Sequence, residues 1–184
     1  MNKLPSLESD RLILRPFVAG DAADVQHLAS EREIASTTLL VPHPYEDGLA
    51  ERWIATHEDA FSTRKTLDLA ITLKQNGQLV GAIGLKLRLS DQCAELGYWI
   101  GRPFWSQGYC TEAGAALIEY GFDQLDLNRV FAKHMTRNPA SGRVLRKLGM
   151  VREGCLRQHV KKWGEFEDLD IYGILKSPES AQPS

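Results

Sequence analysis

The sequence predicts a single α+β domain built around a mixed β-sheet. Two observations carry this prediction. Several short segments alternate apolar and polar residues, as strands do, and others repeat apolar residues at helical spacing. The chain has 184 residues and contains no internal repeat or linker that would divide it, and this length is typical of one domain. We expect the domain to occupy residues 1–176, with a polar tail at 177–184.

The N-terminal third predicts a strand followed by two helices. Residues 11–17 form the first strand, and a short helix begins after Gly20, with Asp21 as its N-cap. Residues 31–44 have no apolar period and contain two prolines, which indicates a loop. From about 45 to 62 the apolar residues again recur at helical spacing.

The centre of the chain predicts a three-stranded meander. From Thr66 to residue 74 the apolar period is two, and Asn76-Gly77 then gives a strong hairpin signal. Residues 79–87 form the returning strand, and residues 94–101 form the next one.

The C-terminal half alternates helices and strands before a closing hairpin. Asn138-Pro139 has the composition of a helix start, and Gly149 that of a helix end. His134 is predicted to be structural, whereas His27 and His57 are predicted to lie on helix surfaces. The expected elements are a helix over 111–124, a strand over 129–136, a helix from Asn138 to Gly149, and strands over 150–160 and 168–175 joined by a turn at Trp163-Gly164.

Composition narrows the classes of function. Lys and Arg number 22 against 24 Asp and Glu, a formal charge of −2, which provides no general attraction to nucleic acid or to an anionic membrane. The longest apolar run, at 79–85, is far shorter than the roughly 20 residues of a membrane span. Cys93, Cys110 and Cys155 lack zinc-ligand spacing, so we expect no metal site and a reducing, cytoplasmic location.

One strand-loop-helix junction, at residues 98–113, has the features of a phosphate site. A strand ends, Gly108 turns the chain, and a helix starts near Thr111. Free backbone N–H groups at a helix N-terminus attract phosphate, although one glycine before a helix is more often only a turn. Three alternatives are absent from the sequence: a dinucleotide-binding G-x-G, a Walker loop and a G-x-S-x-G elbow.

Residues 105–113, W-S-Q-G-Y-C-T-E-A, resemble the pyrophosphate loop of the GNAT acetyltransferases, and in particular of their RimJ/RimL branch, which acetylates ribosomal proteins. Four other stretches agree in the same order: R-L-I-L-R-P at 11–16, E-L-G-Y-W at 95–99, N-R-V at 128–130, and residues 138–150. This resemblance covers about residues 8–175.

The resemblance implies a mostly antiparallel sheet of about seven strands, with a splay between the fourth and fifth, flanked by about four helices. It also implies that acetyl-CoA is the cosubstrate. Its pantetheine arm would lie along Tyr98, Trp99 and Ile100, and Asn138 and Ser141 would meet the pantetheine or its thioester. The residues implied at the pyrophosphate are Gln107, Gly108, Tyr109, Cys110 and Thr111.

The resemblance also implies the catalytic roles. Glu95 stands where relatives carry an active-site glutamate, so it is the candidate base, although an ordinary strand carboxylate is equally consistent with its position. Leu145 replaces the tyrosine that protonates the departing thiol in many relatives, which leaves Ser141 as the candidate acid or thiolate stabiliser. A backbone N–H near Tyr98 or Trp99 is expected to stabilise the oxyanion.

Two residues depart from the family pattern. Ser106 stands where a glycine is common, and Cys110 where glycine or alanine is usual. A thiol at a helix N-terminus is a possible nucleophile, but direct transfer needs none, so we interpret Cys110 as a small packing residue.

The acceptor is expected to be a primary amine, foremost a protein N-terminal α-amine. His43, Tyr45 and Trp163 are the predicted substrate-binding residues, because their loops flank the expected acceptor cleft. A small amine, such as a polyamine, an amino-acid derivative or an antibiotic, remains open as the acceptor, as does a non-catalytic acyl-CoA-binding module. Relatives often pair, so a homodimer is possible.

Overall fold

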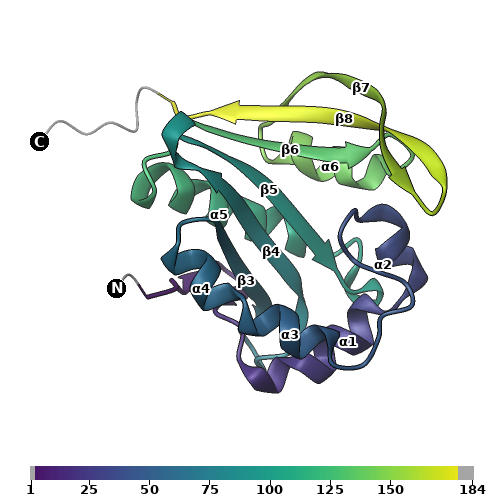
Figure 1. The fold of residues 1–184 in the computed structure, drawn as a ribbon. Helices are drawn as coiled ribbons and strands as arrows, with labels where there is room; N and C mark the ends of the chain where they lie inside the picture. Colours follow the sequence, from purple (N-terminus) through teal and green to yellow (C-terminus); the bar gives the residue numbers. More distant parts are fainter. Residues whose placement is uncertain (1–2, 178–184) are drawn as a thin grey trace, which may run out of the picture.

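The computed structural model describes residues 3–177, which form an open mixed sheet with helices on both faces (Figure 1). The eight strands of the described residues lie in the order β1-β2-β3-β4-β5-β6-β8-β7. The strands are β1 (Leu7–Glu8), β2 (Leu12–Arg15), β3 (Thr66–Leu73), β4 (Leu79–Arg88), β5 (Cys93–Ile100), β6 (Arg129–Met135), β7 (Val151–Lys162) and β8 (Glu165–Leu175). The α-helices are α1 (Ala22–Ala29), α2 (Arg32–Thr37), α3 (Leu49–Ala55), α4 (His57–Ser62), α5 (Tyr109–Gln124) and α6 (Pro139–Lys147).

The sheet is antiparallel except between β5 and β6. This parallel pairing joins only Cys93–Glu95 to Arg129–Phe131. Beyond Glu95 the two strands separate, and Gly97 in the middle of β5 is exposed. The predicted splay is therefore confirmed, and it lies where β5 has a neighbour on one edge only.

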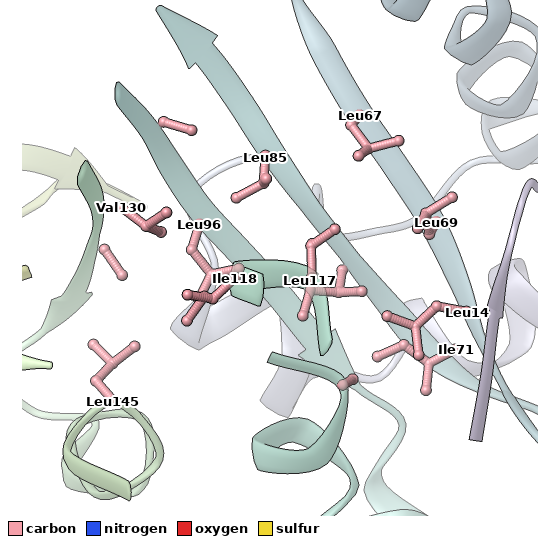
Figure 2. Close-up of a cluster of buried hydrophobic side chains, with 14 of the residues drawn as sticks. Leu14, Leu67, Leu69, Ile71, Leu85, Leu96, Leu117, Ile118, Val130 and Leu145 are labelled. Carbon is pink, nitrogen blue, oxygen red and sulfur yellow. The ribbon is translucent and has the colours of Figure 1, made fainter. Parts of the chain in front are cut away.

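Two apolar clusters hold the helices to the sheet. On one face, α5 inserts Leu117 and Ile118 against Ile71 and Leu85 of the central strands, and α6 adds Leu145 to the same cluster (Figure 2). On the other face, α1 and α3 cover Ala70 and other small residues. The strand alternation read from the sequence decides which residues face each cluster.

The N-terminal region differs most from the prediction. The expected loop at 31–44 contains α2, which buries Ile34 and Ala35. The single helix expected at 45–62 is two helices that meet at Thr56. A six-residue helix is too short to establish an apolar period, and the contacts of α2 are with Arg102 and Arg137, which are distant in the chain. The two-residue strand β1 was also not predicted.

Asp21 lies at the N-cap of α1, as predicted, but its carboxylate makes no capping bond to that helix. It accepts instead from Arg15, at 2.7 and 2.8 Å, and from the Val18 backbone N–H, at 2.8 Å. The predicted surface position of His57 is wrong. His57 is only 4% exposed, because its face of α4 turns inward against Phe17 and Trp53. His27 is exposed and His134 buried, as predicted. Residues 178–184 of the tail predicted at 177–184 lie outside the described residues. No helix within residues 3–177 is long and apolar enough to cross a membrane.

Candidate active site

The loop between β5 and α5 presents free backbone N–H groups. α5 begins at Tyr109, two residues before the predicted start, and its first hydrogen bond runs from the Glu112 N–H to the Gly108 carbonyl, at 3.1 Å. The N–H groups ahead of Glu112 have no helical carbonyl to bond, and they lie at the positive end of the helix dipole. Gly108 has φ +83°, a conformation that glycine adopts without strain.

Ser106 also has a left-handed backbone, with φ +62°. Most residues adopt this conformation at a cost of about 1–2 kcal/mol, which gives a physical reason for glycine at this position in relatives.

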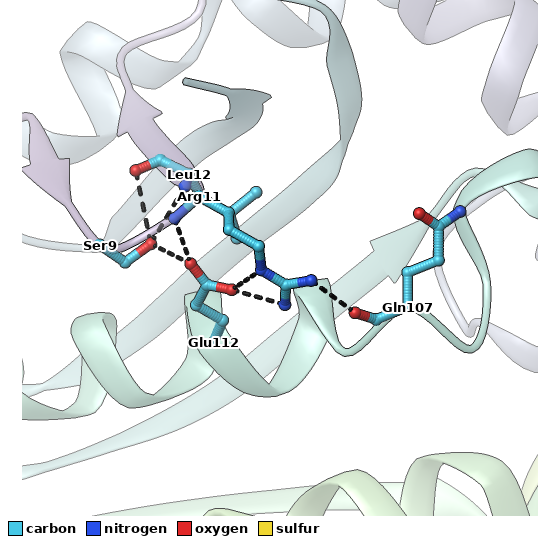
Figure 3. Close-up of polar contacts among 5 residues, drawn as sticks. All are labelled: Ser9, Arg11, Leu12, Gln107 and Glu112. Carbon is cyan, nitrogen blue, oxygen red and sulfur yellow. Dashed lines mark hydrogen bonds and ion pairs between the residues drawn. The ribbon is translucent and has the colours of Figure 1, made fainter. Parts of the chain in front are cut away.

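A polar network ties this loop to the N-terminal strands (Figure 3). One Glu112 carboxylate oxygen accepts from the Ser9 hydroxyl at 2.7 Å and from the Arg11 backbone N–H at 2.8 Å. The other accepts from Arg11 Nε at 2.7 Å. Arg11 also donates to the Gln107 carbonyl, at 3.0 Å. Burial alone would raise the pKa of Glu112, but these bonds outweigh it and lower the pKa.

Glu95 lies at the last paired position before β5 and β6 separate. Its carboxylate forms an ion pair with Lys133 of β6 at 3.1 Å, and its side chain is 30% exposed. One carboxylate oxygen makes this contact, so the second can accept from another group. Glu95 and Trp99 project from the face of β5 opposite to Tyr98, as odd and even positions of a strand must.

Tyr98 reaches α6 from β5. Its hydroxyl lies 2.7 Å from Ser141 Oγ, and Ser141 occupies the first turn of the helix. Asn138 caps that helix as predicted, because its side-chain oxygen accepts from the Ser141 N–H at 3.3 Å. Burial raises the pKa of Tyr98, so the phenol keeps its proton at neutral pH.

Cys110 and Leu145 occupy apolar surroundings. Burial raises the pKa of the Cys110 thiol, which keeps it in the un-ionised form that is a poor nucleophile. Leu145 is fully buried in the larger cluster. At the end of β5, the Ile100 carbonyl accepts from the Trp105 indole N–H at 2.6 Å.

At the predicted acceptor side, the structure brings His43 and Trp163 together, with ring centres 6.1 Å apart. The Arg32 guanidinium lies over the Trp163 ring, at 5.2 Å, and Lys162 Nζ donates to the Val41 carbonyl at 3.1 Å. Tyr45 instead packs half-buried against the cluster under α1 and α3.

Helix α2, which the sequence did not predict, is tied to both diverging strands. Glu33 pairs with Arg102, just after β5, at 3.2 Å. The Ser36 carbonyl accepts from Arg137, just after β6, at 2.6 Å. Arg137 is therefore bonded to α2. Both contacts join residues that are far apart in the chain, so no local pattern in the sequence predicts them.

Comparison with known proteins agrees with this geometry. Residues 11–151 match the family model described as the acetyltransferase (GNAT) domain. An uncharacterized N-acetyltransferase from Bacillus subtilis (strain 168), YoaA, is 32% identical over 177 residues, which cover 95% of this chain and 99% of that protein. The ribosomal-protein-serine acetyltransferase of Escherichia coli (strain K12) is 29% identical over 136 residues, covering 67% and 74%.

A solved structure has the same fold. The ribosomal-protein α-N-acetyltransferase RimL, in complex with coenzyme A, superimposes with a TM-score of 0.86 over 93% of this chain and 98% of that one, at 18% identity. The matched family model spans most of the chain and includes both the β5–β6 gap and the loop before α5. The chain therefore belongs to the GNAT family of acetyltransferases and is an N-acetyltransferase.

Proposed function

We propose that this enzyme moves an acetyl group from acetyl-CoA to a protein N-terminal α-amine, as a member of the RimJ/RimL branch. The observation that carries the proposal is the placement of Glu95 and the Tyr98–Ser141 pair, on opposite faces of β5, where β5 leaves β6. The name of the E. coli relative, a ribosomal-protein-serine acetyltransferase, supports a protein acceptor.

The residues of the gap fit acetyl-CoA. When bound, the cosubstrate supplies an activated acetyl thioester. The N–H groups from Gln107 to Thr111 would hold its pyrophosphate at the start of α5. Beyond Glu95, the β6-facing backbone edge of β5 lacks a neighbouring strand. Successive residues of a strand bond toward opposite edges, so this edge offers the backbone groups of Tyr98 and the Ile100 N–H to the pantetheine amides, whereas the Trp99 backbone faces β4.

Glu95 is proposed to accept the proton of the attacking amine, directly or through one water. An α-amine has an ordinary pKa of about 7.7–8.0, against about 10.4 for lysine. It therefore gives up its proton to a carboxylate more readily, which favours an N-terminal acceptor. His43 and Trp163 are proposed to contact the acceptor residues next to the amine.

Ser141 is proposed to donate a hydrogen bond to the departing sulfur. The Tyr98 phenol, whose raised pKa keeps it protonated, can donate to Ser141 Oγ. The serine proton is then free to point at the thiolate. Asn138 uses its side-chain oxygen for the cap, so its amide nitrogen is left to bind the pantetheine.

The test is acetyl transfer to matched peptides. We expect turnover of acetyl-CoA with a peptide bearing a free N-terminal serine or alanine, and none with the same peptide acetylated at its N-terminus but carrying a free lysine. Spermidine and an aminoglycoside serve as small-amine acceptors. Turnover with these alone would contradict the protein acceptor, and binding of acetyl-CoA without turnover of any acceptor would favour an acyl-CoA-binding module.

The thiol-side roles are tested by Ser141→Ala and Tyr98→Phe. Each is expected to lower kcat roughly tenfold, about the contribution of one hydrogen bond. Because Tyr98 acts through Ser141, the double variant should lose no more than Ser141→Ala does. Additive losses would contradict the proposed relay.

A further inference from the structure

Two residues of the motifs that carry the family resemblance have no part in the chemistry above. One is Arg11, at the start of the R-L-I-L-R-P segment, and the other is Glu112, in the first turn of α5. The structure joins them across 101 residues of sequence through three hydrogen bonds from Arg11 and Ser9. The Glu112 side chain is only 16% exposed, whereas that of Arg11 is 51% exposed.

Arg11 extends this contact to the loop. Its Nη1 donates to the Gln107 carbonyl, while Nε and Nη2 face one Glu112 oxygen, each at 2.7 Å. The guanidinium also lies 4.8 Å from the Tyr109 ring centre. The planar fork of arginine allows these contacts together, because its donors point in fixed and different directions.

The Gln107 carbonyl and the Gly108 N–H belong to one planar trans peptide, so they point in opposite directions. Holding the carbonyl therefore fixes the direction of the N–H. The next carbonyl, that of Gly108, accepts from the Glu112 backbone N–H. Glu112 thus holds two successive peptides of the loop, one through its own backbone and one through Arg11.

We propose that Arg11 is a positioning residue for the cosubstrate, which acts with Glu112 to fix the Gln107–Gly108 peptide with its N–H toward the pyrophosphate of CoA. The inference rests on the proposed role of this loop in CoA binding. Gly108 has no Cβ to resist rotation of the peptide, so the orientation depends on contacts from outside the loop. The turn between β1 and β2 thereby becomes part of the cofactor site.

The experiment compares two ligands, CoA and pantetheine, where pantetheine lacks the phosphates. Binding of CoA is measured by calorimetry, and binding of pantetheine by NMR titration, which reads weak affinities. For Arg11→Gln we expect the Kd of CoA to rise roughly tenfold, the loss of about 1.4 kcal/mol, and the Kd of pantetheine to stay unchanged. Arg11→Lys keeps the charge beside Glu112 but not the fork, so it should show the same loss for CoA.

Lys74→Gln is the matched control. Lys74 lies beside the same N-terminal strands, where its ammonium pairs with Glu8 at 2.9 Å and donates to the Ser9 carbonyl at 3.3 Å. Its substitution should leave CoA binding unchanged. Where Arg11→Gln fails to fold, Arg11→Lys decides the question.

Three results would overturn the inference: wild-type affinity for CoA in Arg11→Gln, an equal loss for CoA and pantetheine, or full CoA affinity in Arg11→Lys, which would indicate a direct charge contact. Failure of the wild-type protein to bind CoA would instead remove the proposed function. The two failures are therefore distinct.

Discussion

The two ends of the β5–β6 gap are built differently. At the end near α5, the groups proposed to meet the cosubstrate are mostly backbone N–H groups, held by Glu112 and Arg11. At the end near α2, the candidate groups are side chains of loops, with Trp163 47% exposed and His43 beside it. An invariant ligand can be held by backbone, which all sequences share, whereas a variable acceptor has to be selected by side chains that can change.

The largest effect is expected from Glu95→Gln, because it removes the proposed base and leaves the groups at both ends of the gap in place. Removal of a general base lowers kcat by about 100-fold or more, and CoA binding should not change, since the carboxylate is not expected to contact CoA. Steady-state kinetics with a peptide acceptor, together with calorimetry, give both values.

Lys133→Met is the control for Glu95→Gln, because it removes the ion pair and keeps the carboxylate. Lys133→Met should lower kcat much less than Glu95→Gln does. A loss as large as that of Glu95→Gln would assign the effect to the ion pair.

A smaller effect, confined to the cosubstrate end, is expected from Gly108→Ala. A side chain at φ +83° introduces strain of about 1–2 kcal/mol. A rotation of the loop backbone that relieves this strain would turn its N–H groups away from the pyrophosphate. The Kd of CoA should rise roughly tenfold, as measured by calorimetry.

Gly164→Ala carries the same kind of strain, at φ +92° with open space around the added Cβ, but it lies in the β7–β8 turn. It should lose similar stability and keep CoA affinity. Equal CoA losses in both variants would show that general destabilisation, and not loop geometry, is responsible.

At the acceptor end, Trp163→Ala should raise the KM of the acceptor several-fold and leave that of acetyl-CoA unchanged. The expected loss of acceptor binding free energy, on the order of 1 kcal/mol, is that of one exposed aromatic contact. Phe166→Ala, on the same hairpin and 62% exposed, is the comparison. If the two variants behave alike, Trp163 has no specific role in acceptor binding.

The smallest effect concerns stability, on the face away from α5. Burial lowers the pKa of His57 below its ordinary value of about 6.5, and Asp68 opposes this only in part. Below pH ~6.5 the unfolded chain therefore binds a proton that the folded chain does not, and the free energy of unfolding falls as pH falls, by less than about 1.4 kcal/mol per unit. His57→Phe should remove this slope in urea unfolding between about pH 5 and 7.5.

His27→Gln, at an exposed position of α1, should leave that slope in place. An unchanged slope in His57→Phe would mean that another group titrates.

The parts of the fold that sequence predicted are those fixed by neighbouring residues. Asn138 and Pro139 start α6 because a side-chain oxygen and a fixed φ act within one turn. Gly77, with φ +74°, lies in the turn between β3 and β4. The loop before α5 was located by its glycine and by its resemblance to the family, although α5 begins two residues earlier than expected.

The misassigned parts depend on which surface a segment meets. His57 was predicted to lie on a helix surface, yet its face of α4 meets Phe17 and Trp53. Helix α2 is too short to show a period, and its contacts, Glu33 with Arg102 and Ser36 with Arg137, join segments that are distant in the chain.

The sequence by itself determined the order of nearly all strands and helices, because strand alternation, caps and turn glycines act over a few residues, and its motifs were enough to indicate the family. Only the tertiary structure decided that Glu95 pairs with Lys133, that Tyr98 meets Ser141, and that Arg11 and Glu112 hold the loop. Each of these contacts joins segments that are distant in the chain. Their energies are gained only after the sheet has brought the segments together, so no local pattern encodes them.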